Sequence, residues 1–256
     1  MALNILCCVK RVPMTGGRIV LTADEQAIET RHLGFTISPH EECGVEEAVR
    51  LIEANGGSST VLTLGPPEAE EQLRDCMALG IDRAIHLLAE DEFDGQATAR
   101  AIVAAIEAER AAGTEYEIVF FGNESADAGN FQVGIRVAHA LGWPCVTGVK
   151  AVALEDGGLR LEQEVPGGRD VYRVPLPAVV TVKEGLNLPR YPSVPGRLRA
   201  KKKPVESSTP ERGAQGVAKA RLVVPVDEGS QTEVLGRGAD AAPAVVELLE
   251  RVGVLG

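Results

Sequence analysis

Three short sequences in this chain follow apolar runs that predict buried strands: Val9-Lys10-Arg11, Leu64-Gly65-Pro66 and Gly122-Asn123-Glu124-Ser125. In an open sheet of parallel strands, ligands bind beyond the carboxyl ends of the strands. Gly65 and Gly122 would let a ligand come close to the backbone. A helix that begins near Asn130 would aim free N–H groups at a phosphate. The pattern predicts a crevice for a phosphate-bearing ligand.

Catalytic signals are missing from the sequence. There is no G-x-G-x-x-G or P-loop pattern, and no Ser-His-Asp order or nucleophile elbow. The four histidines at 32, 40, 86 and 139 do not have metal-ligand spacing. We expect His86 to be a structural residue and the pair Glu46-Glu47 to lie on a solvated helix face. These observations favour a binding protein without catalytic residues and without a metal.

Residues 177–204 form the second informative feature, PAVVTVKEGLNLPRYPSVPGRLRAKKKP. A buried strand is predicted first, followed by a segment that contains four prolines. The exposed-looking Val194 lies within it, and a basic cluster closes it. A stiff basic segment on a chain of formal net charge -11 has two interpretations, a solvated linker or a surface that contacts a partner.

Composition narrows the class of protein. The chain has 256 residues, 45% hydrophobic and 25% charged, as in ordinary globular proteins. The acidic excess argues against nucleic-acid binding. Five cysteines without a CxxC pattern favour a reducing compartment. No apolar run is long enough to span a membrane, and no secretory signal is visible. We therefore expect a cytoplasmic or mitochondrial-matrix-like protein that is not secreted and does not insert into membranes.

Strand and helix patterns alternate along the first half of the chain. Strands are predicted at 3–9, 60–64, 83–88 and 118–121, and helices at 41–55, 66–80, 96–112 and 130–141. Alternating residues and Gly-Gly turns then predict antiparallel strands at 146–154, 159–163 and 171–174. The fold class is therefore α/β, a doubly wound and mostly parallel sheet with added antiparallel strands.

The C-terminal quarter has a weaker pattern. After residue 185 little periodicity is visible until an amphipathic helix at 241–252, and residues 204–238 are rich in Gly, Ser, Pro and charge. We expect an extended arm that is ordered only against another chain. The predicted organisation is a nucleotide-binding α/β domain at 1–185, a partner-recognition segment at 186–203 and an arm at 204–256.

Several motifs resemble the β subunit of electron transfer flavoproteins. Around the basic segment they are PAVVTV at 177–182, LNLPRY at 186–191, VP at 194–195 and AKKK at 200–203. Earlier in the chain they include VKRVP at 9–13, VEEAVRL at 45–51 and LGWP at 141–144. The order and spacing match, and the rare LNxPRY string is the most specific of them.

This resemblance implies a fold similar to the adenine nucleotide α-hydrolases, with AMP or a second FAD in the crevice. The implied cofactor-binding residues are Cys8, Ser38, Pro39, His40, Glu41, Leu64, Gly65, Gly122, Asn123, Glu124, Ser125, Asp127, Asn130, Gln132 and Val133. The family has N-P-F/Y where this chain has Ser38-Pro39-His40. One carboxylate of its D-D-x-x-x-Q run is also missing, and Phe131 stands where a polar residue is usual.

The same resemblance implies partners. An α subunit would supply most of the FAD site, flavin-dependent dehydrogenases of the acyl-CoA or N-methyl-amine type would donate electrons, and a quinone oxidoreductase would accept them. Glu164 would pair with an arginine of the mobile flavin domain, and Val194 would anchor the dehydrogenase. The implied partner-binding residues are Glu164, Arg190, Tyr191, Val194, Pro195, Arg197 and Arg199.

Two alternatives stay open on the sequence. One is an electron-bifurcating flavoprotein subunit that holds FAD in the crevice and has NADH as donor. The other is a stand-alone adenine-nucleotide sensor of the universal-stress type, which shares the sheet order. The LNLPRY and AKKK motifs and the long arm favour the electron transfer flavoprotein.

Overall fold

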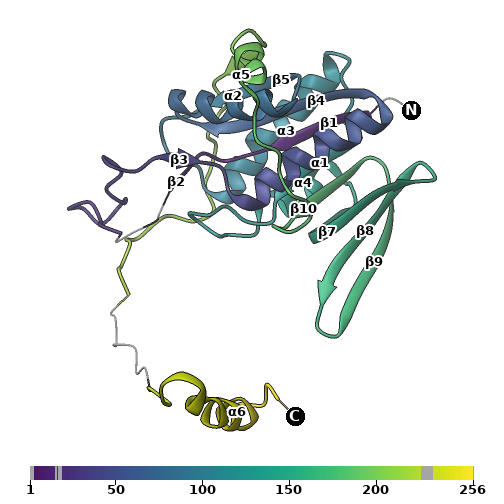
Figure 1. Cartoon of the computed structure of the whole chain (residues 1–256). Coiled ribbons are helices and arrows are strands. Elements are labelled where there is room, and N and C mark those ends of the chain that lie inside the picture. Colours follow the sequence, from purple (N-terminus) through teal and green to yellow (C-terminus); the bar gives the residue numbers. More distant parts are fainter. Residues whose placement is uncertain (1–2, 15, 17–18, 226–232, 256) are drawn as a thin grey trace.

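The computed structural model describes residues 3–14, 16, 19–225 and 233–255. Its centre is a nine-stranded sheet of order β11-β5-β4-β1-β6-β10-β7-β8-β9 (Figure 1). Neighbouring strands are parallel from β11 to β7, and the pairs β7–β8 and β8–β9 are antiparallel. The strands are β1 (Leu3–Cys8), β4 (Gly57–Gly65), β5 (Arg83–Leu88), β6 (Ile118–Gly122), β7 (Cys145–Glu155), β8 (Gly158–Val165), β9 (Gly168–Pro175), β10 (Ala178–Val182) and β11 (Val205–Ser208). This arrangement confirms the predicted α/β class.

Four long helices cover the two faces of the sheet. Residues of α1 (Pro39–Asn55) and α2 (Glu70–Leu79) belong to one hydrophobic cluster, and residues of α3 (Gly95–Ala111) and α4 (Val133–Leu141) belong to the other. In β1, Cys7 faces the first cluster and Cys8 the second, as their adjacency predicts. Strands buried on both faces require the continuous apolar runs seen in the sequence. Each fully buried Leu or Ile stabilises the fold by about 1.5–3 kcal/mol.

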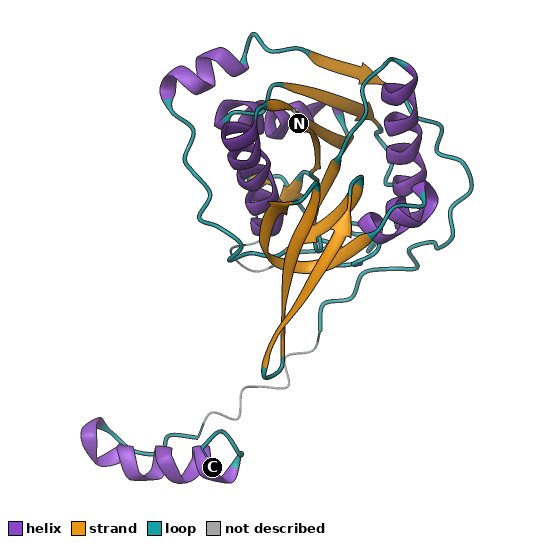
Figure 2. Ribbon diagram, turned by 90° about the vertical axis from the view of Figure 1, so that its right-hand side faces the viewer, coloured by secondary structure: helices purple, strands orange, loops and turns teal. Residues whose placement is uncertain are grey.

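The antiparallel strands add a projection to this body. β8 and β9 extend from it as a long hairpin (Figure 2), and most of the residues of β9 are exposed. A separate two-stranded sheet pairs β2 (Val12–Pro13) with β3 (Phe35–Thr36). Along the chain, this small sheet lies between β1 and α1.

The C-terminal quarter has more regular structure than its sequence indicates. Residues 194–200 form α5 (Val194–Ala200), which begins with a Ser193 cap, and β11 adds a parallel edge strand beside β5. Neither element was predicted, because short elements that pack on an existing surface need no periodicity of their own. After the 3-10 turn η2 (Gly238–Ala241), α6 (Ala242–Arg251) lies apart from the sheet and has no buried residue (Figure 1).

Residues 212–222 of the arm lie along this chain's own body. Asp94 caps α3 by accepting the amide of Ala97 at 2.7 Å, and its other oxygen accepts the amide of Val217 at 3.0 Å. The amide of Leu222 donates to the carbonyl of Glu25 at 2.8 Å. This part of the arm is thus ordered in cis, which corrects the expectation that only another chain could order it.

We predict that Asp94→Ala releases the arm and destabilises the fold by about 1 kcal/mol, the usual cost of losing a cap. Limited proteolysis should then cut within residues 209–222, and urea unfolding should show the loss of stability. Asp94→Asn separates the two roles: its amide oxygen can still cap the helix, but its NH2 group cannot accept the Val217 amide, so it should release the arm with little loss of stability. Equal proteolysis of Asp94→Ala and the unmodified chain would contradict the role given to Asp94.

Candidate functional site

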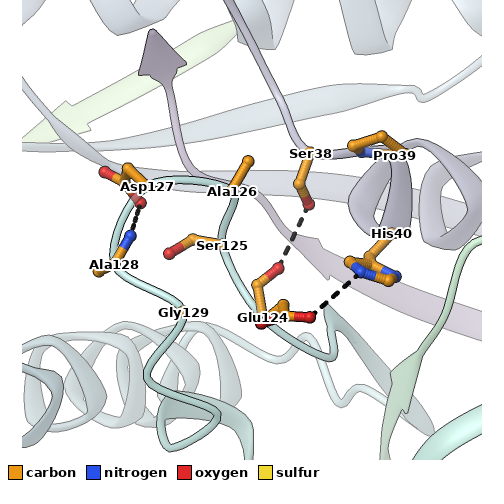
Figure 3. A pocket seen from close by; sticks show the side chains of 9 residues that line it. All are labelled: Ser38, Pro39, His40, Glu124, Ser125, Ala126, Asp127, Ala128 and Gly129. Atoms are coloured by element: carbon orange, nitrogen blue, oxygen red, sulfur yellow. Dashed lines mark hydrogen bonds and ion pairs between the residues drawn. The ribbon is translucent and has the colours of Figure 1, made fainter. Parts of the chain in front are cut away.

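A cavity of about 330 Å³ lies at the carboxyl edge of the sheet. Ser38, Pro39 and His40 of the α1 start form one wall, and residues 124–129 of the loop after β6 form the other. In Figure 3 the His40 ring and the Glu124 carboxylate point toward one another across this space. The start of α1 and the loop after β6 thus border a hollow at the edge of the sheet where the topology predicts a ligand.

Glu41 fixes where α1 begins. It forms a capping box with Ser38, whose amide donates to Glu41 Oε2 at 2.8 Å, while Ser38 Oγ accepts the Glu41 amide. The other oxygen, Oε1, accepts the amide of Lys10 at 2.9 Å. Ser38 Oγ also lies 3.4 Å from the carbonyl oxygen of Glu124. The first turn of α1 is therefore tied to the ends of β1 and β6.

An ion pair and a histidine–carboxylate contact lie at the cavity. Lys10 Nζ is 2.6 Å from Asp127 Oδ2, and His40 Nε2 is 3.6 Å from Glu124 Oε1. Partial burial would raise the pKa of Asp127, but the charge and hydrogen bond of Lys10 outweigh it and lower the pKa. The cavity thus presents two carboxylates, one of them neutralised by lysine. The sequence indicated Lys10 only as a residue at the end of a strand. Its pairing with Asp127 could not be predicted, because the two residues are far apart in the chain.

Six predicted cofactor-binding residues line the cavity: Ser38, Pro39, His40, Glu124, Ser125 and Asp127. The others lie outside its lining: Cys8, Glu41, Leu64, Gly65, Gly122, Asn123, Asn130, Gln132 and Val133. Glu41 is buried behind the wall, and Leu64 and Gly65 end the neighbouring strand β4. Burial raises the pKa of the Cys8 thiol, which keeps it protonated.

Gly122 allows α1 to pack closely against the end of β6. A Cβ there would come within 2.7 Å of Glu41 Cγ and 3.3 Å of His40 Cβ. The glycine lets the first turn of α1 approach the end of β6, so Gly122→Val would disturb the fold and cannot test ligand contact alone. Asn123 is similar, because its Oδ1 accepts the amide of Gly148 at 2.9 Å and the hydroxyl of Thr181 at 2.8 Å.

The helix predicted to begin near Asn130 begins at Val133. Gly129 and Phe131 have positive φ angles of 55° and 54°, which right-handed helix does not permit. Asn130 is therefore in the loop, and the first free N–H groups lie three residues further along the chain.

The 186–203 segment is anchored on α1. Asn187 Nδ2 donates to the carbonyl oxygen of Cys43 at 3.0 Å and to Glu47 Oε2 at 2.9 Å. The guanidinium of Arg190 forks onto Glu46, with contacts of 2.9–3.2 Å, and onto Glu53 at 2.7 and 2.9 Å. The hydrogen bond to Glu53, then that to Glu46, raises the pKa of Arg190.

These contacts change one expectation. Glu46 and Glu47 are 4% and 6% exposed, so the prediction of a solvated carboxylate pair is wrong. Both carboxylates are satisfied by residues about 140 positions away, which no local pattern reveals. Arg190 bonds to carboxylates of its own chain, and these bonds position the segment.

Four apolar side chains of the segment are exposed: Leu188 (91%), Tyr191 (95%), Val194 (72%) and Leu198 (59%). Val194 is the first residue of α5 and not a residue of an irregular loop, and Pro195 follows it in the first turn. Leu188 and Leu198 were missed in the sequence, although an apolar residue inside LNLPRY was a usable signal. Together these four residues form what we call the apolar row.

Some of the basic cluster is used within the chain. Arg197 pairs with Asp75 at 3.0 Å. Lys203 Nζ donates to the carbonyl of Met77 at 3.1 Å and to that of Ile81, beyond the end of α2. Arg199 is exposed. On the hairpin, Glu164 lies 2.8 Å from Lys150 Nζ, and that hydrogen bond lowers the pKa of Glu164.

Comparison with known proteins identifies the family. A family model described as "Electron transfer flavoprotein domain" matches residues 27–212. The chain is 33% identical over 204 residues to the electron transfer flavoprotein subunit beta of Bacillus subtilis, covering 80% of the chain and 78% of that protein. It is 32% identical over 255 residues to the protein of the same name from Homo sapiens, covering 98% of each. The chain belongs to the electron transfer flavoprotein β-subunit family. Its relatives are named as electron-transfer subunits, which confirms the family that the motifs indicate.

The described residues contain neither a helix suited to crossing a membrane nor a side-chain cluster suited to a metal ion. No helix in that part of the chain combines the length and apolar character needed to cross a membrane. No group of three or more His, Cys, Asp or Glu side chains there could hold a metal ion.

Burial raises the pKa of Glu41 to about 8, and the amides of Ser38 and Lys10 offset only part of that effect. Since an ordinary Glu has a pKa of 4.5, the folded chain holds a proton between about pH 4.5 and 8 that the unfolded chain has released. We predict that the free energy of unfolding falls with rising pH in this window, by at most about 1.4 kcal/mol per pH unit, and levels off above it.

Urea unfolding at pH 5–9 measures this dependence. Glu41→Gln should be less stable at low pH, because its amide cannot accept both N–H groups, and it should lack this part of the slope. Identical slopes in the two proteins would contradict the buried proton.

Proposed function

We propose that this chain is the docking subunit of a heterodimeric electron transfer flavoprotein. An α subunit holds most of the FAD site. Flavin-dependent dehydrogenases, of the acyl-CoA or N-methyl-amine type, donate electrons, and a quinone oxidoreductase accepts them. In this proposal the chain acts as part of a carrier and contributes no catalytic residue, because the flavin carries out the redox chemistry.

The observation that carries the proposal is the apolar row on a segment fixed in place. Monomeric proteins rarely gather large apolar side chains at such exposure without a partner. The anchors of Asn187 and Arg190 order the segment in advance, so little conformational entropy is lost on docking. Arg199 beside the row would meet acidic patches and speed encounter.

α6 supports the α-subunit contact. It exposes Val245 and Val246, and none of its residues is buried within the described chain. An amphipathic helix without a covering surface is expected to pack on a partner. Glu164 would exchange Lys150 for an arginine of the flavin domain, a surface pair that salt would weaken.

AMP is the proposed ligand of the cavity. A volume of about 330 Å³ is at the small end of ligand sites and suits a mononucleotide better than a dinucleotide. Glu124 could accept hydrogen bonds from ribose hydroxyls, and the start of α4 could offer N–H groups to the phosphate. Bound AMP would stabilise the folded chain by mass action.

The bifurcating alternative, with FAD in the cavity and NADH as donor, requires a larger occupant. The stand-alone nucleotide sensor is disfavoured by the apolar row and by family membership. The cofactor content therefore distinguishes the AMP-containing flavoprotein from the bifurcating one. A stable flavin-containing complex with an α subunit distinguishes both of them from the sensor.

We predict one FAD and one AMP per heterodimer, measured by mass spectrometry of the denatured, purified complex. Ser125→Trp should fill the cavity and remove AMP while FAD stays bound. Ala112→Trp, on an exposed residue beyond α3, is the control and should retain both ligands. Two FAD per heterodimer would favour bifurcation, and the absence of adenine nucleotide would overturn the AMP assignment.

We also predict that Val194→Ala weakens coupling to the dehydrogenase about tenfold, the effect of losing roughly 1–2 kcal/mol of apolar contact. Steady-state electron transfer from the donor enzyme measures it, while FAD content and chemical reduction stay normal. Val217→Ala removes an equally exposed valine (73% exposed) from the arm and should change nothing. Unchanged transfer from every candidate donor after Val194→Ala would show that this side chain is not the anchor.

A further inference from the structure

His40 joins the cavity to the base of the 186–203 segment. It lines the cavity, and its Nε2 faces Glu124 Oε1 at 3.6 Å (Figure 3). Its other nitrogen, Nδ1, accepts the amide of Glu184 at 2.8 Å. Glu184 is the second residue after β10 and lies two residues before the segment. One imidazole thus contacts both places that the proposed function uses.

The hydrogen bond to Glu184 decides which nitrogen of His40 carries the proton. A ring nitrogen that accepts an N–H must be unprotonated, so in the neutral ring the hydrogen is on Nε2. That hydrogen is directed at the cavity wall and at the Glu124 carboxylate. At 3.6 Å the contact is longer than a good hydrogen bond, which leaves Nε2–H able to donate to a bound ligand.

The ring transmits electronic changes between its two nitrogens. An acceptor that takes the Nε2 hydrogen makes the Nδ1 lone pair a better acceptor, since hydrogen bonds in a chain polarise one another. The bond from the Glu184 amide would then strengthen. This bond matters because Gly185 follows, with a φ of 90°, and the next anchors on α1 are Asn187 and Arg190.

We propose that His40 is a positioning residue that couples the cavity to the 186–203 segment. Negative charge that faces Nε2, from the Glu124 carboxylate or from a hydrogen-bond acceptor on a bound nucleotide, strengthens the bond between Nδ1 and the Glu184 amide. That bond holds the start of the segment. The relation is reciprocal, so a partner that fixes the segment also favours the occupied cavity. This inference rests on the proposed function for what the cavity and the segment bind.

Hydrogen exchange of the full-length chain in complex with its α subunit tests the coupling. The readout is a peptide that covers residues 183–191, whose bonded amides include those of Glu184, Leu186 and Arg190. Three forms are compared, the unmodified chain, His40→Asn and His40→Phe, each with and without Glu124→Ala. A peptide from α3 is the internal control.

His40→Phe removes the acceptor and should raise exchange at Glu184 by about threefold to tenfold, the effect of one lost hydrogen bond. His40→Asn keeps an acceptor oxygen on Cγ, where Nδ1 was, but has nothing at the place of Nε2. It should restore most of the protection. Glu124→Ala should raise exchange about twofold in the unmodified chain, and should have no effect in either His40 variant.

The coupling is tested by whether the effect of Glu124→Ala depends on His40. If Glu124→Ala does not change exchange in the chain that retains His40, or changes it equally in His40→Asn, the proposed coupling is wrong. AMP, added as the probe, should slow exchange in the unmodified chain and not in His40→Asn. If AMP fails to bind but the Glu124 effect depends on His40, the coupling stands and the nucleotide part of the proposed function falls.

Discussion

The position of α1 is the constraint on which the site depends. Its first turn is held by the buried Glu41 carboxylate, which accepts amides from Ser38 and from Lys10 at the end of β1. The glycine at 122 lets that turn approach β6, and His40 reaches the chain after β10. Three adjacent strands, β1, β6 and β10, thus end against one helical turn.

The same helix also anchors the 186–203 segment. Further along α1, Glu46, Glu47 and Glu53 hold Asn187 and Arg190. The carboxylates of Glu46 and Glu47 are buried, and their desolvation is compensated by the amide and guanidinium groups that they bind. α1 therefore holds the part of the apolar row near Asn187 and Arg190, while Val194 and Leu198 lie on α5, which packs against α2.

Much of this could be predicted from the sequence. The buried strands and amphipathic helices were visible because their periods differ, and the cavity followed from the rule that ligands bind beyond the carboxyl ends of parallel strands. The start of α4 was misplaced because two residues of positive φ, Gly129 and Phe131, interrupt a sequence with helical composition. The bonds of Arg190 to Glu53 and Glu46 could not be predicted, because these carboxylates are 137 and 144 residues away in sequence. Contacts of that range leave no trace in local patterns.

The central claim is that the segment anchored on α1 is the surface on which the electron donor docks. Hydrogen exchange of the heterodimer, with and without a saturating donor dehydrogenase, tests it most directly. The account predicts that protection increases in peptides that contain Leu188, Tyr191, Val194 and Leu198, and does not increase on the outer face of α3. Protection confined to other surfaces, with the 186–203 segment unchanged, would contradict it.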